Sequence, residues 1–118
     1  MANPSLIDAT VIYGNTYSFL ASTTTTNVVS NATGTNSIYK VNSLVAANIN
    51  TVSASITLEF NNGGSNNFIA RNMVVPAYTT LVIVGKDTGL YLKENCSLQV
   101  TASANVCVVT TASWEEIT

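Results

Sequence analysis

The sequence has few ionisable groups. It contains no histidine, four lysine and arginine residues together, and six aspartate and glutamate residues. Without histidine, a serine–histidine nucleophile cannot form. Two cysteines without an imidazole do not complete a zinc shell, so we expect no bound metal and no cofactor. Four cations spread over 118 residues do not build the basic surface that nucleic-acid binding requires.

Long apolar runs are also missing. No stretch approaches the roughly 20 apolar residues that cross a bilayer, so we expect no membrane partner. Residues 1–5 lack the basic start and the apolar stretch of a signal peptide. The sequence therefore predicts synthesis in a cytoplasm without export.

Threonine, asparagine and serine take the place of the missing charges, with 17, 15 and 12 residues. Charged residues make up 8% of the chain against about 25% in a typical soluble domain. The hydrophobic fraction of 47% and the net charge of −2 exclude a disordered chain. Threonine and valine favour strands and asparagine favours turns, so the composition indicates a β protein.

Apolar residues recur with period two or in short runs, which predicts strands and no helix. We expect an all-β, antiparallel β-sandwich or jelly-roll-like fold of about 8–9 short strands. It forms a single domain over residues 10–118, after a flexible N-terminal arm over residues 1–9. The expected strands are 16–21, 27–30, 38–47, 52–60, 68–75, 80–85, 90–92, 97–102 and 106–114.

The alternation also predicts which faces are buried. In the strand over residues 38–47, Tyr39, Val41, Val45 and Ala47 share one face, and residues 80–85 are apolar on both faces. Such a two-faced strand is expected at the centre of a sheet or under a neighbour.

The clearest strand has Ile56, Leu58 and Phe60 inward. It leads into residues 61–66, whose Asn-Gly pair is typical of hairpin turns. Pro76 ends the returning strand because proline lacks the donor that a ladder needs.

Cys96 and Cys107 allow one disulfide at most. If residues 100–102 and 106–108 flank a tight hairpin, Cys96 lies opposite residues 110–111 and Cys107 is out of register. Because bridging needs Cα atoms within about 7 Å, we predict two free, mostly buried thiols.

Asp87, Thr88 and Gly89 form the triplet of aspartic proteases, in which two aspartates share a proton. The apolar residue expected before that triplet is replaced by Lys86, and a turn accounts for the same residues. We therefore interpret the triplet as a turn, keep the protease as a minor alternative, and predict no enzymatic activity.

Trp114 and the five tyrosines could form a platform for stacking sugars, with amide side chains binding hydroxyl groups. Trp114 closing one end of the core is the simpler interpretation. A carbohydrate-binding adhesin module stays open as an alternative function.

Open sheet edges are normally protected by lysine, proline or inward charge, and this chain has little of these. A protein whose edges are covered by neighbouring copies tolerates that exposure. The residues that we predict at such an interface are Leu20, Tyr78, Trp114, Glu115 and Glu116.

Six segments from Ile38 onward share their order and spacing with a known family: 39–48, 69–77, 81–84, 86–88, 91–98 and 114–117. Through these segments the sequence resembles small virion structural proteins of tailed bacteriophages that infect cyanobacteria and other marine bacteria. Asn95-Cys96 and Trp114 depart from the family's usual Gly-Asp and tyrosine.

The resemblance implies a non-enzymatic protein that is present in many copies in the virion and assembles in the host cytoplasm. Its implied partners are copies of itself, in a homo-oligomer such as a trimer, and other virion proteins such as the major capsid protein. A capsid-decorating or cement role is our first prediction, and a neck or tail component is the alternative.

Overall fold

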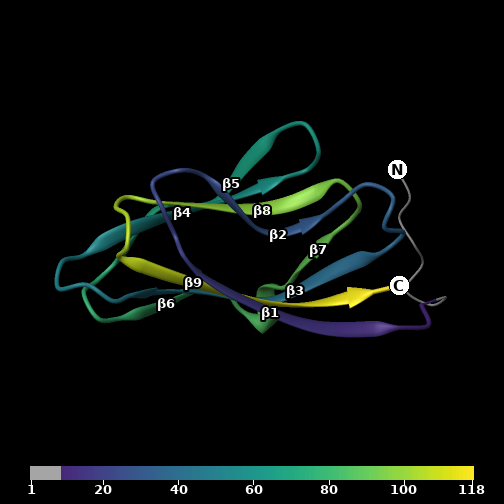
Figure 1. Ribbon diagram of the computed structural model, residues 1–118, viewed down its shortest axis with the longest axis horizontal. Coiled ribbons are helices and arrows are strands. Elements are labelled where there is room, and N and C mark those ends of the chain that lie inside the picture. The colour runs from purple at the N-terminus through teal and green to yellow at the C-terminus, as the bar shows by residue number, and fades with distance from the viewer. Residues whose placement is uncertain (1–8) are drawn as a thin grey trace.

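Nine strands and one short 3-10 turn make up the computed structural model, which describes residues 9–118 (Figure 1). The all-β prediction is confirmed, whereas the arm expected over residues 1–9 falls outside the described residues apart from its last one. The strands are β1 Ile12–Leu20, β2 Thr26–Asn31, β3 Ile38–Asn48, β4 Ala54–Asn61, β5 Asn66–Val75, β6 Thr80–Val84, β7 Leu90–Leu92, β8 Cys96–Ala102 and β9 Val108–Ile117, and the turn η2 is Lys86–Thr88.

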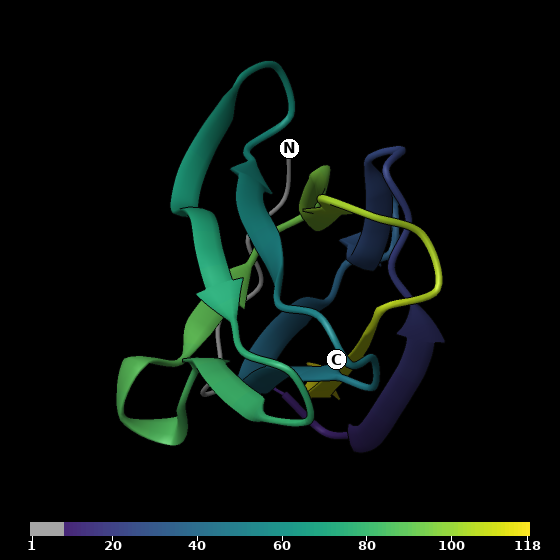
Figure 2. The same ribbon diagram turned by 90° about the vertical axis from the view of Figure 1, so that its left-hand side faces the viewer.

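The strands form two antiparallel sheets that stack face to face (Figures 1 and 2). The first sheet has the order β1-β9-β3-β6, with β7 beside β6 on the same edge of β3, and the second has the order β2-β8-β4-β5. The β4–β5 hairpin extends beyond the rest of the sandwich in both views. Every described helix is too short to span a membrane.

The core lies between the sheets and follows the predicted alternation in β4. Ile56 and Leu58 are fully buried, and Phe60 packs against the same cluster from its rim. The hairpin turn places Gly63 at a φ of 101°, which an Asn-Gly sequence accommodates without strain. Strand β5 ends at Val75, directly before the proline, as predicted.

The faces of β3 differ from the prediction after its first residues. The register with β9 shifts between Val41 and Ser43, so Asn42 is the extra residue of a β-bulge. Before the bulge Val41 points inward, and after it Leu44 and Ala46 are the buried residues, while Val45 is only partly buried. The prediction that Val45 shares the inner face with Val41 is wrong because a one-residue bulge exchanges the two faces.

Strands β8 and β9 do not form the hairpin expected between residues 100–102 and 106–108. Strand β8 pairs with β2 and β4, whereas β9 pairs with β1 and β3 in the other sheet. Cys96 and Cys107 are free thiols, the first buried and the second half-buried. They are separated because the chain crosses from one sheet to the other between β8 and β9, and not because of the register of a hairpin.

Strand β6 is also placed differently. It pairs with β3 alone among the described strands and lies at an edge, with 59% of the surface of Val82 exposed. The expectation of a central or covered strand is therefore wrong, since Val82 lies on an outward face that no neighbouring sheet covers.

Candidate assembly surface

Strand β1 forms a long outer edge of the first sheet. It begins four residues earlier than predicted, because it pairs with β9 along its whole length, from Ile12 opposite Ile117 to Leu20 opposite Val109. Its nine residues include no charged residue and no proline. Among the described strands it pairs with β9 alone. Strand β1 therefore lacks the usual protection of an exposed edge.

The backbone hydrogen bonds at the two ends of β1 show which groups face the open edge. Val11 and Thr118 exchange N–H···O bonds of 3.1 and 2.9 Å, and the N–H of Ala21 donates to the carbonyl of Val108 at 2.8 Å. Odd-numbered residues of β1 therefore bond to β9. In an antiparallel ladder this bonding alternates, so the five even-numbered residues point their N–H and C=O groups outward.

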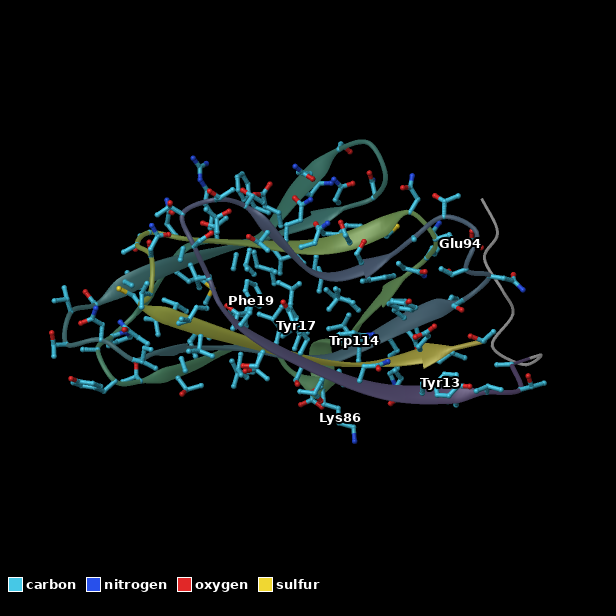
Figure 3. The ribbon with its side chains drawn as sticks, viewed as in Figure 1. Tyr13, Tyr17, Phe19, Lys86, Glu94 and Trp114 are labelled. Carbon is cyan, nitrogen blue, oxygen red and sulfur yellow. The ribbon has the colours of Figure 1, made fainter. Side chains whose placement is uncertain are left out.

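Aromatic side chains follow the inner face of the same strand. Tyr17 and Phe19 stack with ring centroids 5.3 Å apart, and Tyr17 lies opposite Ala112, which is buried in the core. Figure 3 shows Tyr17, Phe19 and Trp114 grouped along β1 and β9. Tyr13 remains 60% exposed, so the aromatic row reaches from the core to the solvent at this side of the sandwich.

Four of the five predicted interface residues lie on β1 or β9. Leu20 is exposed at the end of β1, and Trp114 lies between Asn15 of β1 and Val41 of β3. Trp114 is partly buried and packs against the core, which agrees with the simpler interpretation of this residue.

Glu115 and Glu116 follow Trp114 on β9. A carboxylate oxygen of Glu115 accepts a hydrogen bond of 2.9 Å from the side-chain amide of Asn42, the bulged residue of β3. Glu116 lies opposite Tyr13 on one side and Tyr39 on the other. Partial burial, and secondly the charge of Glu116, raise the pKa of Tyr39 above its ordinary value.

Tyr78, the fifth predicted interface residue, lies in the turn between β5 and β6. Its φ is 58°, and the turn is closed by bonds from the N–H and hydroxyl of Thr79 to the carbonyl of Pro76, of 3.2 and 2.7 Å. The side chain is 71% exposed. Tyr78 therefore lies on neither of the two strands, β1 and β9, that carry the other four residues.

The residues suspected of chemistry are dispersed in the described part of the chain. Asp87 is exposed within η2, next to Lys86, which projects away from the sheets (Figure 3). No group of three potential metal ligands occurs among residues 9–118. The turn interpretation of Asp87 therefore agrees with its position.

Glu94 is a buried acidic residue whose role the sequence did not predict. It is only 4% exposed, and its two carboxylate oxygens accept hydrogen bonds from the N–H groups of Gly34 at 2.7 Å and Asn36 at 3.1 Å. Nothing near Glu94 in the sequence signals this contact, because the donors lie 60 and 58 residues away. Glu94 fixes a loop, which is a structural role.

A polar cavity of about 280 Å³ opens on the second sheet, where β2, β8 and the β4–β5 turn meet. Its lining contains amide and hydroxyl side chains and no charged side chain, so it matches an uncharged, hydrogen-bonding ligand better than an ion. The lining residues are Asn27, Ser30, Asn31, Ala32, Asn61, Gly63, Asn95, Cys96, Ser97 and Gln99.

Comparison with known proteins establishes the fold. No family model and no curated protein matches the sequence. Among solved structures, a chain of the Bacillus endospore appendages, a family of disulfide-linked pili, resembles this one with a TM-score of 0.58 and 12% identity, over 100% of this chain and 96% of that chain. At that identity the likeness extends to the fold alone.

Two capsid structures are more distant. A pentameric capsid protein from metagenomic phage sequences aligns over 84% of this chain and 59% of that chain, with a TM-score of 0.47 and 20% identity. A chain of infectious bursal disease virus, Gx strain, aligns over 91% of this chain and 32% of that chain, with a TM-score of 0.46 and 11% identity. These likenesses are too weak to argue from, so the sequence resemblance to phage virion proteins stays a prediction.

Proposed function

We propose that this protein is a non-enzymatic structural part of a bacteriophage virion, present in many copies, with capsid decoration or cement as its role. The observation that carries the proposal is β1, a nine-residue sheet edge that bears no charge and exposes several apolar side chains. An exposed and unprotected edge promotes aggregation of an isolated protein, whereas in an assembly neighbouring subunits cover it and bond to it.

The partners that fit this surface are other copies of the chain and the major capsid protein beneath them. A single strand edge with a few apolar side chains gives a weak contact. When many linked copies bind at once, each further contact forms at a high effective concentration, and the combined attachment becomes strong. The sequence resemblance from Ile38 onward supports the virion as the place of assembly.

Counting copies in purified particles tests this proposal. Heads and tails are separated, and quantitative mass spectrometry measures the ratio of this chain to the major capsid protein. A decoration protein is expected in heads at a copy number near that of the shell protein. Tens of copies or fewer, in the tail fraction, would support the neck or tail alternative instead, and absence from the particle would refute both.

The polar cavity favours a second candidate, a carbohydrate-binding module. Its amide and hydroxyl lining suits neutral sugars, although the lining includes no aromatic ring for stacking. NMR titration with neutral mono- and oligosaccharides at millimolar concentration tests it. Asn27→Ala combined with Gln99→Ala should abolish binding, while Asn67→Ala, exposed on β5, should not. Trp114→Ala is no clean test, because Trp114 supports the core.

A further inference from the structure

We infer that β1 pairs antiparallel with β1 of a second copy, so that the first sheets of two molecules join into one continuous sheet. This inference rests on the proposed function, which names other copies of the chain as partners, and it specifies how two copies join. It rests on the outward-facing backbone groups of β1 and on the side chains beside them.

Symmetry restricts the register of such a pair. In a β1–β1 pair, the residues that exchange hydrogen bonds must be the outward-facing ones of both strands, and these all have even numbers. An even-numbered residue of one copy therefore lies opposite an even-numbered residue of the other. The two-fold axis therefore passes through a residue and not between two residues. Pairing all nine residues requires the axis at Thr16, which places Ile12 opposite Leu20 and Gly14 opposite Ser18. Every outward N–H and C=O of the strand then has a partner.

The side chains are complementary in this register. On the outer face, exposed Ile12 meets exposed Leu20 of the other copy. On the inner face, Tyr13 meets Phe19 and Asn15 meets Tyr17, at positions that are not hydrogen-bonded, where side chains approach most closely. No charge repels its symmetry mate, since β1 contains none.

The other described edges are less suited to this pairing. Strand β2 has six residues and β6 has five. Strand β5 is longer but carries Arg71, a charge of the kind that protects an exposed edge; its guanidinium carbon lies 5.0 Å from the ring centroid of Phe68. Strand β1 thus combines length, absence of charge and exposed apolar side chains.

The size of the surface sets the expected strength. Nine residues in a strand span about 30 Å. One strand edge covers less than the roughly 800 Å² per partner of a standard interface. We therefore expect a reversible dimer in the micromolar to millimolar range, which many copies in a shell would reinforce.

Gly14 offers a matched pair of variants. Its N–H points to the open edge, β9 does not use it, and a Cβ built at this position meets nothing within 4 Å. Gly14→Pro removes the outward donor and places a ring at the edge, whereas Gly14→Ala keeps the donor. By sedimentation equilibrium up to millimolar concentration, wild type and Gly14→Ala should dimerise. Gly14→Pro should remain monomeric with an unchanged far-ultraviolet circular dichroism spectrum.

Cysteine cross-linking tests the register, in a Cys107→Ser background that removes the half-buried thiol. With the axis at Thr16, two Thr16→Cys residues have Cα atoms about 5.5 Å apart, within disulfide range. Two Ser18→Cys residues are offset by four positions, about 13 Å, which is too far. Oxidation should therefore link the first variant and not the second.

A wild type that stays monomeric at millimolar concentration would overturn the inference. So would a dimer that Gly14→Pro leaves intact, or cross-linking of Ser18→Cys in preference to Thr16→Cys. These results leave the virion proposal untouched, because copy counting in particles tests that proposal separately.

Discussion

Replacing Glu94 with glutamine should destabilise the protein through one loop. The carboxylate accepts two backbone N–H groups, and both donors have left-handed backbones, with a φ of 93° at Gly34 and 52° at Asn36. A positive φ is uncommon outside glycine, and although asparagine adopts it more readily than other residues, hydrogen bonds to the loop stabilise this conformation. Glu94, almost fully buried behind the loop, supplies that support.

The magnitude follows from the two bonds. A hydrogen bond to a charged group contributes about 1.5–3 kcal/mol. Glutamine retains one acceptor oxygen and turns its amide toward the second N–H, so one bond is lost and the other loses its charge. Gly34 and Asn36 are exposed residues, and water can replace part of the loss. We expect Glu94→Gln to lower the free energy of unfolding by about 2 kcal/mol, or the melting temperature by about 8 °C.

Urea denaturation measures the global effect, and NMR hydrogen exchange of the Gly34 and Asn36 amides measures the local one. Both amides should exchange faster in Glu94→Gln. The matched control is Glu59→Gln on the outer face of β4, for which we expect a change within about 0.5 kcal/mol. Equal stability of Glu94→Gln and wild type, with unchanged exchange at both amides, would refute the reasoning.

Three further predictions concern the core and one tyrosine. Thr110 is fully buried, and its hydroxyl has no hydrogen-bond partner among the described residues, so Thr110→Val should stabilise the protein by about 1 kcal/mol in urea denaturation; a loss of stability would reveal a partner for the hydroxyl. Leu58→Ala should cost about 3 kcal/mol and Val82→Ala less than 1, since only Leu58 is enclosed; equal costs would contradict the edge position of β6. Tyr39 should ionise above pH 10 in an ultraviolet titration, with a lower pKa in Glu116→Gln. Because the unfolded chain loses this proton first, stability should fall as the pH rises past 10, and a pKa that Glu116→Gln leaves unchanged would exclude the charge as a cause.

Much of the strand pattern is encoded in short stretches of sequence. The alternation around Ile56 and Leu58, the Asn-Gly turn before β5 and the stop at Pro76 each depend on residues that are neighbours in the chain. Steric preference and burial periodicity act over a few residues, so sequence reasoning recovered these features. The scarcity of charge and proline also predicted sheet edges without protection, and β1 is such an edge.

The β3 bulge shows where that reasoning fails. The sequence around Asn42 alternates acceptably in either register, and only pairing with β9 reveals the extra residue. Once the bulge is present, every residue after it changes face, which exchanges Val45 for Leu44 in the core. The split of β8 and β9 between two sheets is of the same kind, because short connections permit either a hairpin or a crossing between sheets.

By itself, the sequence determined the class of the protein: all-β, sparsely charged, without histidine, and short of edge protection. Tertiary structure alone decided that β1 is the long open edge, that its even-numbered residues face outward, and that Glu94 holds a loop. The physical reason is range. Turns and alternation arise from neighbouring residues, whereas the contact of Thr16 in β1 with Ser113 in β9 and the hydrogen bonds to Glu94 join residues that lie 58 to 97 positions apart.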